Sequence, residues 1–431
     1  MNNEERLEIE GLAGQRVLSG TIHVGGAKNA ILKALASTIL FADEVNLTNV
    51  PDIEDVRQTV KLLADLGGQV SAPEKHSYLI DTQSLDKTVI APEISKKLRA
   101  SIVLTGPLLA RFGRVSFPHP GGCVIGKRPI DLFLEGFKAM GAKVELKNEL
   151  YEIASTGSKL HGANIFFKNI SVTATETFLM AAILAEGKTV LKNCALEPEI
   201  VSLGEFLKKC GAQISGLGTP TIEIVGGDLL LSQGQIYQTV PDRIEAGSFL
   251  VLAGLLAKDM TIADCRPDHL DAVIEFLHHS GVKMEIGENY IRVRDNDSGN
   301  FVANDLKTHE YPGFPTDLQA PMTVFLTQAK GQSFVFETIF EGRLNHLESL
   351  ERMGAKVKIL DSHRAIIDGP SDLSGRELIS PDLRAGLAYI ISGLVAKGQT
   401  NVHNVGYIDR GYEDIEGRLN ALGANIKRIR I

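Results

Sequence analysis

Two kinds of segment alternate along the chain and recur six times. In the first kind, an amphipathic helical pattern ends in a glycine and a strand pattern follows; the six glycines are Gly67, Gly141, Gly211, Gly281, Gly354 and Gly423. Glycine suits the left-handed position that ends a helix, so each copy predicts a helix, a stop and a strand. The repeat of about 70 residues is longer than the repeats of solenoid proteins, so a solenoid is excluded.

The second kind of segment is apolar on nearly every side. Six such segments precede the glycine-ended helices, for example 30–44, 175–187, 244–259 and 385–398. Helices of this kind are buried, and short alternating strands such as 188–194 follow them. A chain of 431 residues exceeds one core, so six units indicate two domains of three units each. The predicted fold class is α/β with buried helices and outer sheets, the reverse of a doubly wound fold.

Charged residues stand at the expected starts of the six apolar helices. They are, in order, Lys28, Arg99, Glu176, Arg243, Asp317 and Arg384. Helix N-termini favour anions, so four basic residues at parallel N-termini would line a basic cleft for an anionic small molecule. The alternative, at any one of these positions, is an ordinary solvated charge in a first helical turn.

The composition of the chain argues against several classes of function. The net charge of −8 argues against nucleic acid and a membrane surface as partners, and 44% hydrophobic residues suffice for sizeable cores. No membrane-spanning run and no apolar leader after Met1 are present, which favours the cytoplasm. The cysteines do not have the spacing of metal ligands. The chain contains neither a Walker loop nor a dinucleotide-binding glycine fingerprint. We therefore expect neither a metal nor a cofactor.

One of the four cysteines stands apart from the others. Cys123 lies in the stretch FPHPGGCVIGKRP, among glycines and prolines just before a helical pattern. Basic neighbours would favour a reactive thiolate there, whereas an inert loop thiol is the alternative. Cys194, Cys210 and Cys265 fall in strand or helix patterns and are expected in the core. Two further alternatives stay open on the residues alone: Asp317 as a helix cap, and His278 with His279 as a solvated helix face rather than metal ligands.

Four motifs together resemble the UDP-N-acetylglucosamine enolpyruvyl transferase family, over essentially the whole chain. They are GGAKNA at 25–30, PGGCVIGKRPID at 120–131, PTDLQA at 315–320 and IDRGYE at 408–413. The resemblance implies two inside-out α/β barrels of three repeats each, residues 1–27 with 241–431 as the catalytic barrel domain and 28–240 as a second one carrying the cysteine loop. It implies transfer of the enolpyruvyl group of phosphoenolpyruvate to the 3′-hydroxyl of UDP-N-acetylglucosamine by addition and elimination. That reaction is the first committed step of peptidoglycan precursor synthesis, and these two small molecules are the expected partners.

The resemblance also implies roles for individual residues. Cys123 would be the catalytic acid and Asp317 the base for the sugar hydroxyl. The phosphoenolpyruvate site would comprise Lys28, Asn29, Arg128 and Arg410, with Arg343 and Arg384 as further cleft arginines. The nucleotide-sugar site would comprise Arg99, Arg128, Pro129, Ile130, Asp131, Leu132, Asn169, Ile170, Ser171, Val172, Asp317 and Ile339.

The sequence departs from the commoner family pattern at a few positions. Lys33 stands where Pro is frequent, Phe133 where His is frequent, and Asn169 where some members have Lys. Two rival functions remain: an enolpyruvyl transferase acting on shikimate 3-phosphate, and a non-catalytic paralogue that binds the nucleotide sugar. The Asp-Lys-Ser signature of the first is absent, and the joint presence of Cys123, Asp317, Lys28 and Arg410 argues against the second.

Overall fold

A computed structural model describes residues 5–121, 125–126, 129–295 and 300–430. These residues divide into two compact units. Unit 1 contains the described parts of 1–25, 124–127 and 241–431, and unit 2 those of 26–123 and 128–240. Each unit has its own hydrophobic core. No helix in the described part of the chain is both long enough and apolar enough to span a membrane.

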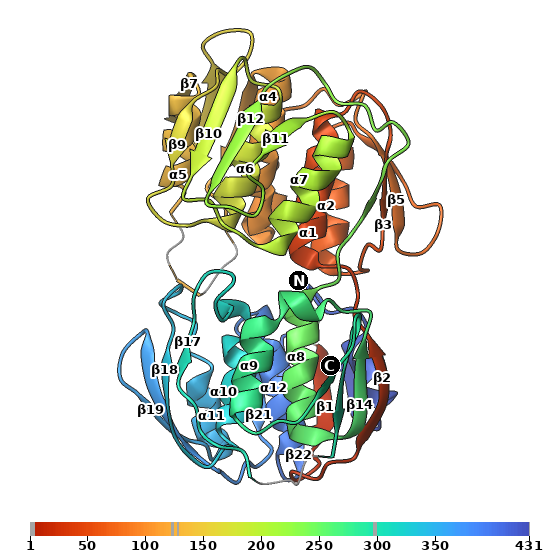
Figure 1. The fold of residues 1–431 in the computed structure, drawn as a ribbon, viewed down its shortest axis with the longest axis vertical. Helices are drawn as coiled ribbons and strands as arrows, with labels where there is room; N and C mark the ends of the chain where they lie inside the picture. The colour runs from red at the N-terminus through yellow and green to blue at the C-terminus, as the bar shows by residue number, and fades with distance from the viewer. Residues whose placement is uncertain (1–4, 122–124, 127–128, 296–299, 431) are drawn as a thin grey trace. The chain divides into compact units, whose positions relative to one another are not determined.

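Unit 2 places helices inside three separate sheets (Figure 1). In spatial order the sheets are β13 (Ile236–Gln238), β3 (Val45–Thr48), β5 (Ser77–Asp81) and β4 (Gln69–Ser71); β6 (Arg114–Pro118), β8 (Leu150–Ser155) and β7 (Ala142–Lys147); and β11 (Gln213–Ser215), β12 (Thr221–Val225), β10 (Lys188–Lys192) and β9 (Asn164–Phe166). The helices are α1 (Lys28–Ser37), η1 (Thr38–Leu40), α2 (Glu54–Asp65), α3 (Pro92–Lys97), η2 (Arg99–Leu104), α4 (Thr105–Phe112), α5 (Asp131–Ala139), α6 (Val172–Ile183) and α7 (Pro198–Lys209).

Unit 1 repeats this plan. Its sheets are β21 (Glu377–Ile379), β22 (Gln399–His403), β1 (Glu5–Glu10) and β23 (Ile426–Arg430); β15 (Glu285–Ile286), β16 (Tyr290–Arg294), β14 (Ala257–Ala263) and β2 (Leu18–His23); and β17 (Leu306–Lys307), β18 (Gly331–Phe336), β20 (Arg364–Gly369) and β19 (Lys356–Ile359). The helices are α8 (Arg243–Leu256), η3 (Pro267–His269), α9 (Asp271–His279), η4 (Thr316–Leu318), α10 (Gln319–Leu326), α11 (Leu347–Met353), α12 (Leu383–Val395), η5 (Val405–Tyr407) and α13 (Ile415–Asn420).

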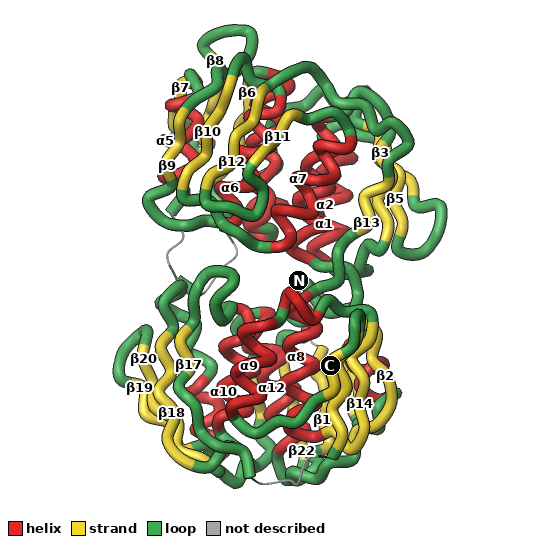
Figure 2. Tube along the Cα trace, viewed as in Figure 1, coloured by secondary structure: helices red, strands yellow, loops and turns green. Residues whose placement is uncertain are grey.

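The repeating unit of the fold is a buried helix that joins two parallel strands. Helices α6, α10 and α12 connect β9 to β10, β17 to β18 and β21 to β22, and each of these strand pairs is parallel. Parallel neighbours need such a crossover because a tight turn can join only antiparallel strands. Figure 2 shows the helices inside each unit and the strands around them. The predicted α/β class with inner helices and outer sheets is confirmed, although the strands of a unit form three sheets rather than one continuous barrel.

The apolar helices are buried because they have no polar face to expose. Every residue of α8 is buried, and the same holds for α12. Each buried leucine or phenylalanine contributes about 1.5–3 kcal/mol relative to an exposed one. The predicted helix stops are also confirmed: all six repeat glycines have positive φ, from 85° at Gly141 to 112° at Gly354, and a strand follows each.

The predicted helix starts are correct in part. Lys28 and Arg243 begin α1 and α8, and Arg384 is the second residue of α12. Arg99 and Asp317 instead lie in the short 3-10 helices η2 and η4, which lead into α4 and α10. Glu176 was placed wrongly: α6 begins at Val172, where the Ser171 hydroxyl caps it, so Glu176 lies inside the helix and is fully buried.

Candidate active site

In unit 1, Asp317 is brought beside α8 and α12 by close packing at η4. Leu318, the next residue, packs against α8 at Gly247, where a Cβ atom would collide with the Leu318 side chain. Glycine at that position therefore lets η4 approach α8 closely. With Leu318 packed in this way, the side chain of Asp317 lies near the start of α12, where it contacts Arg384.

Asp317 forms two ion pairs, one with each predicted cleft arginine of unit 1. Its Oδ1 accepts a hydrogen bond from Arg343 Nη2 at 2.6 Å, and its Oδ2 accepts bonds from Arg384 Nη2 at 2.8 Å and Nε at 3.1 Å. Both arginine side chains are 6% exposed and that of Asp317 is 21% exposed. The resemblance named these three residues separately, and the structure brings them together.

Burial and the two arginines act on Asp317 in opposite directions. Burial raises the pKa of Asp317, but the charges of Arg384 and Arg343 and their hydrogen bonds outweigh it and hold the pKa far below its usual range. The carboxylate is therefore ionised at neutral pH. Arg343 Nε is buried and has no hydrogen-bond partner among the described residues.

Arg384 is fixed in place by its own helix start and by Tyr412. The Asp382 carboxylate accepts the backbone N–H groups of Arg384 and Ala385, which caps α12. Arg384 Nη1 donates to the Tyr412 hydroxyl at 3.2 Å, and that hydroxyl also lies 3.4 Å from Ser248 Oγ. Tyr412 was not singled out from the sequence, although it stands two residues after Arg410 in the fourth motif.

Arg343 is supported by the buried residue His346. His346 Nδ1 donates to the Arg343 carbonyl at 2.9 Å, and its Nε2 lies 2.8 Å from the Thr323 hydroxyl. Burial lowers the pKa of His346 to about 4, so the ring is neutral at physiological pH and adds no charge beside the arginine. No local pattern in the sequence marked this histidine.

In unit 2, Lys28 forms a buried ion pair at the start of α1. Its Nζ lies 2.7 Å from Asp55 Oδ2 in α2. Asn29 follows in the first turn, and its carbonyl accepts a hydrogen bond from Lys33 Nζ at 2.7 Å. Lys33 also lies 3.3 Å from the buried Glu176. Asp55 is a partner that sequence reasoning missed, because a carboxylate in a first helical turn is unremarkable.

The other predicted ligands of unit 2 lie at or near helix starts. Arg99 begins η2 and donates to the Pro120 carbonyl at 3.2 Å. Asp131 begins α5, with Pro129 exposed and Ile130 buried before it and Leu132 after it. Asn169 and Ile170 precede Ser171, which caps α6, and Val172 begins that helix. These segments present helix N-termini, which suit a diphosphate.

Of the remaining predicted site residues, two lie in unit 1 and two lie outside the described residues. Arg410 and Ile339 belong to unit 1 and are half-buried. Cys123 and Arg128 lie outside the described residues. Cys194, Cys210 and Cys265 are buried, as predicted, and burial raises the pKa of each thiol to about 11.

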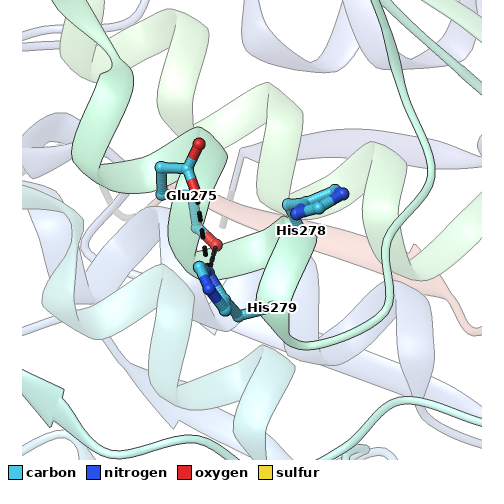
Figure 3. Close-up of side chains that lie close together, drawn as sticks. All are labelled: Glu275, His278 and His279. Carbon is cyan, nitrogen blue, oxygen red and sulfur yellow. Dashed lines mark hydrogen bonds and ion pairs between the residues drawn. The ribbon is translucent and has the colours of Figure 1, made fainter.

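A different side-chain cluster lies on the surface of α9. Glu275, His278 and His279 offer metal-ligand atoms within 4.8 Å of one another, and all three are exposed. Figure 3 shows His279 turned toward Glu275, whose carbonyl accepts a hydrogen bond from His279 Nδ1 at 2.7 Å. The cluster thus occupies the solvated helix face that the sequence predicts for the two histidines.

Known proteins similar to this chain show which family it belongs to. The profile of EPSP synthase (3-phosphoshikimate 1-carboxyvinyltransferase) matches residues 12–419. Proteins named UDP-N-acetylglucosamine 1-carboxyvinyltransferase are similar over nearly the full length: that of Desulforapulum autotrophicum is 44% identical over 99% of this chain and 100% of its own, and that of Coxiella burnetii 42% identical over 97% and 95%.

Solved structures show the same fold at low sequence identity. The enolpyruvyl transferase NikO from Streptomyces tendae is similar with a TM-score of 0.87 at 21% identity, over 100% of both chains. EPSP synthase from Acinetobacter baumannii is similar with a TM-score of 0.72 at 20% identity, over 99% of this chain and 100% of that one. The chain belongs to the EPSP synthase family of enolpyruvyl (1-carboxyvinyl) transferases.

Proposed function

We propose that this chain transfers the enolpyruvyl group of phosphoenolpyruvate to the 3′-hydroxyl of UDP-N-acetylglucosamine and releases phosphate. Asp317, held as a carboxylate between two buried arginines, is the observation that carries the proposal. Such a group combines a proton acceptor with two cations that bind phosphate or carboxylate in two-point fashion. The full-length relatives at 42–44% identity support UDP-N-acetylglucosamine, rather than shikimate 3-phosphate, as the acceptor.

In the addition step Asp317 takes the proton of the sugar hydroxyl, and the oxygen bonds to the central carbon of phosphoenolpyruvate. The methylene carbon receives a proton from the Cys123 thiol, so a methyl group forms and the central carbon becomes tetrahedral. In the elimination step the methyl group returns a proton to the Cys123 thiolate and the double bond re-forms as the central carbon releases phosphate, which takes the proton held by Asp317. Each positioned proton transfer typically contributes about 10²–10⁴-fold to the rate.

The arginines also control when Asp317 acts as a base. While Arg343 and Arg384 both bind it, the low pKa of Asp317 makes it a weak proton acceptor. Phosphoenolpyruvate is a multiply charged anion that competes for the same guanidinium groups, and sharing them raises the pKa of Asp317. The base therefore strengthens when the second substrate is in place. Lys28, Asn29, Arg128 and Arg410 are the further residues that we propose to bind phosphoenolpyruvate.

The biological setting follows from the proposed reaction. Its product is the first committed precursor of peptidoglycan, so the enzyme would serve cell wall biogenesis, cell shape and cell division, with the cytoplasm as the expected compartment. Fosfomycin, an epoxide that mimics phosphoenolpyruvate and alkylates the family's loop cysteine, would be an inhibitor. The reaction as proposed uses no metal and no cofactor.

Phosphate release from phosphoenolpyruvate, measured with different acceptors, tests the proposal. We expect release with UDP-N-acetylglucosamine and none with shikimate 3-phosphate or without an acceptor. Release with shikimate 3-phosphate alone would assign the chain to the rival transferase reaction. Binding of UDP-N-acetylglucosamine by calorimetry without any release would identify a non-catalytic paralogue.

A further inference from the structure

Glu337 is a buried carboxylate of unit 1 to which no role has yet been assigned. It directly follows β18, and its relative exposure is 0%. Oε1 accepts the backbone N–H groups of Ile339 at 2.8 Å and Phe340 at 3.1 Å, and Oε2 accepts the Thr316 hydroxyl at 2.9 Å. Among the described residues no basic side chain forms an ion pair with it, so these three donors are what stabilise its buried oxygens.

The donors come from two segments that both belong to the proposed active site. Thr316 immediately precedes Asp317, the proposed base, in η4. Ile339 is a proposed nucleotide-sugar contact, and the ring of Phe340 lies 5.3 Å from the Arg343 guanidinium that binds Asp317. A single side chain thus connects the segment of the base with the turn at 339–340.

The backbone around Glu337 is fixed independently of its side chain. Glu337 N donates to the His363 carbonyl at 2.8 Å, and His363 Nδ1 donates back to the Glu337 carbonyl at 2.6 Å. Thr338 exchanges two hydrogen bonds with Thr308, at 2.8 and 2.7 Å. The carboxylate is therefore not required to hold its own segment in place, which leaves the link between Thr316 and the turn as its distinct contribution.

We propose that Glu337 is a positioning residue that holds the Asp317 segment and the turn at 339–340 in a fixed relation, so that the sugar hydroxyl is presented to the base. This inference rests on the function proposed above. Displacing a reacting group by a fraction of an ångström lowers kcat far more than it weakens binding, because binding contacts tolerate small shifts better than proton transfer does.

Variants of Thr316 test the link without disturbing the turn. Thr316→Val keeps the shape of the side chain and removes its hydroxyl, so we expect kcat to fall about 10- to 100-fold while the KM for UDP-N-acetylglucosamine changes by less than about threefold. Thr316→Ser keeps the hydroxyl and should restore most of kcat. A Val variant with parental kcat and KM, or a Ser variant as slow as the Val variant, would overturn the proposal.

Glu337→Gln tests the other end of the link. The amide keeps one acceptor oxygen and loses the charge, so we expect a lower kcat together with a higher KM for UDP-N-acetylglucosamine. In the double variant Thr316→Val, Glu337→Gln, kcat should be no lower than in the slower single variant, since both changes break the same link. Multiplicative losses in the double variant would contradict that link.

A matched control separates positioning from general stability. Asp305 is an exposed carboxylate that accepts the Phe334 backbone N–H at 2.8 Å at the same sheet. Among the described residues it has no hydrogen bond or ion pair with Thr316 or Asp317. Asp305→Asn should leave kcat and KM unchanged. Melting temperatures of all variants are measured alongside; a Glu337→Gln variant that melts lower but keeps both kinetic constants would make Glu337 purely structural. An inactive parent would instead refute the proposed function.

Discussion

Asp317 and Arg384, 67 positions apart in the chain, form a two-point ion pair in which both Nε and Nη2 of the arginine donate to one carboxylate oxygen. Because Arg343 binds the other oxygen, the base of the proposed reaction is held by the cations that would bind its anionic substrate. This arrangement keeps the carboxylate ionised and oriented before any substrate arrives. It also makes the pKa of Asp317 depend on which other anions Arg343 and Arg384 bind.

The first prediction concerns the charge of Asp317. Asp317→Asn keeps the size of the side chain but cannot accept the hydroxyl proton, so kcat should fall by about 10²–10⁴-fold. The two arginines lose their counter-charge, so binding of the anionic nucleotide sugar should be unchanged or tighter by calorimetry. Asp361→Asn, which alters an exposed aspartate paired with Arg364, is the control and should keep full activity.

Near-parental turnover of the Asn variant would remove Asp317 from the base role. Weaker nucleotide-sugar binding in that variant would argue that Asp317 contacts the ligand mainly as an acceptor of hydrogen bonds.

The second prediction concerns which thiol reacts. Burial raises the pKa of Cys194, Cys210 and Cys265 to about 11, so at neutral pH they are almost entirely protonated and poor nucleophiles. Fosfomycin should therefore inactivate the enzyme with a single label at Cys123, located by peptide mass spectrometry. Substantial labelling of any of the three buried cysteines would contradict this expectation.

The third prediction concerns the acid role of Cys123. Cys123→Asp keeps an ionisable proton, and Lys127 and Arg128, which are close in the sequence, would favour the carboxylate, so activity should persist with an optimum at lower pH. Cys123→Ser offers a hydroxyl that is too weakly acidic and should lose most turnover. The Asp variant should resist fosfomycin because it lacks the soft nucleophile. A fully active Ser variant would rule out the thiol as the acid.

The fourth prediction concerns the buried Glu176 of unit 2. Burial raises the pKa of Glu176 from an ordinary 4.5 to about 8, despite Lys33 nearby. The folded protein therefore binds this proton more tightly than the unfolded chain, and the free energy of unfolding should fall as pH rises from about 4.5 to 8. Glu176→Gln mimics the protonated group and should flatten that decline in urea unfolding curves.

Glu205→Gln, which changes an exposed glutamate paired with Lys208, serves as the control and should leave the decline in stability unchanged. If the Glu176 variant shows the parental slope, or is severely destabilised even near pH 5, then Glu176 is ionised throughout and the Lys33 ion pair is stabilising.

Features governed by local rules could be predicted from the sequence. The stops at Gly67, Gly141 and their equivalents follow from the left-handed backbone that only glycine adopts easily, and the structure has all six. The starts at Lys28 and Arg243 were also predicted correctly. The predicted start at Glu176 was wrong because the threonines before it already belong to α6. The residue that caps this helix is Ser171, five residues before Glu176.

The contacts within the site could not be predicted in this way. The resemblance named Asp317, Arg343 and Arg384, but no periodicity indicates that residues 26 and 67 positions away converge on one carboxylate. His346, Tyr412 and Glu337 were missed because a buried polar partner has no characteristic spacing; its role depends on which groups the folded chain leaves without hydrogen bonds.

The most direct test of the account is the structure of the product formed in heavy water. Phosphoenolpyruvate and UDP-N-acetylglucosamine are incubated with the enzyme in D₂O, and the nucleotide product is analysed by NMR. Addition followed by elimination passes through a methyl group, so we predict an enolpyruvyl ether at the 3′-oxygen with deuterium in its methylene group. Unchanged UDP-N-acetylglucosamine, attachment at another oxygen, or a methylene group without deuterium would contradict the account.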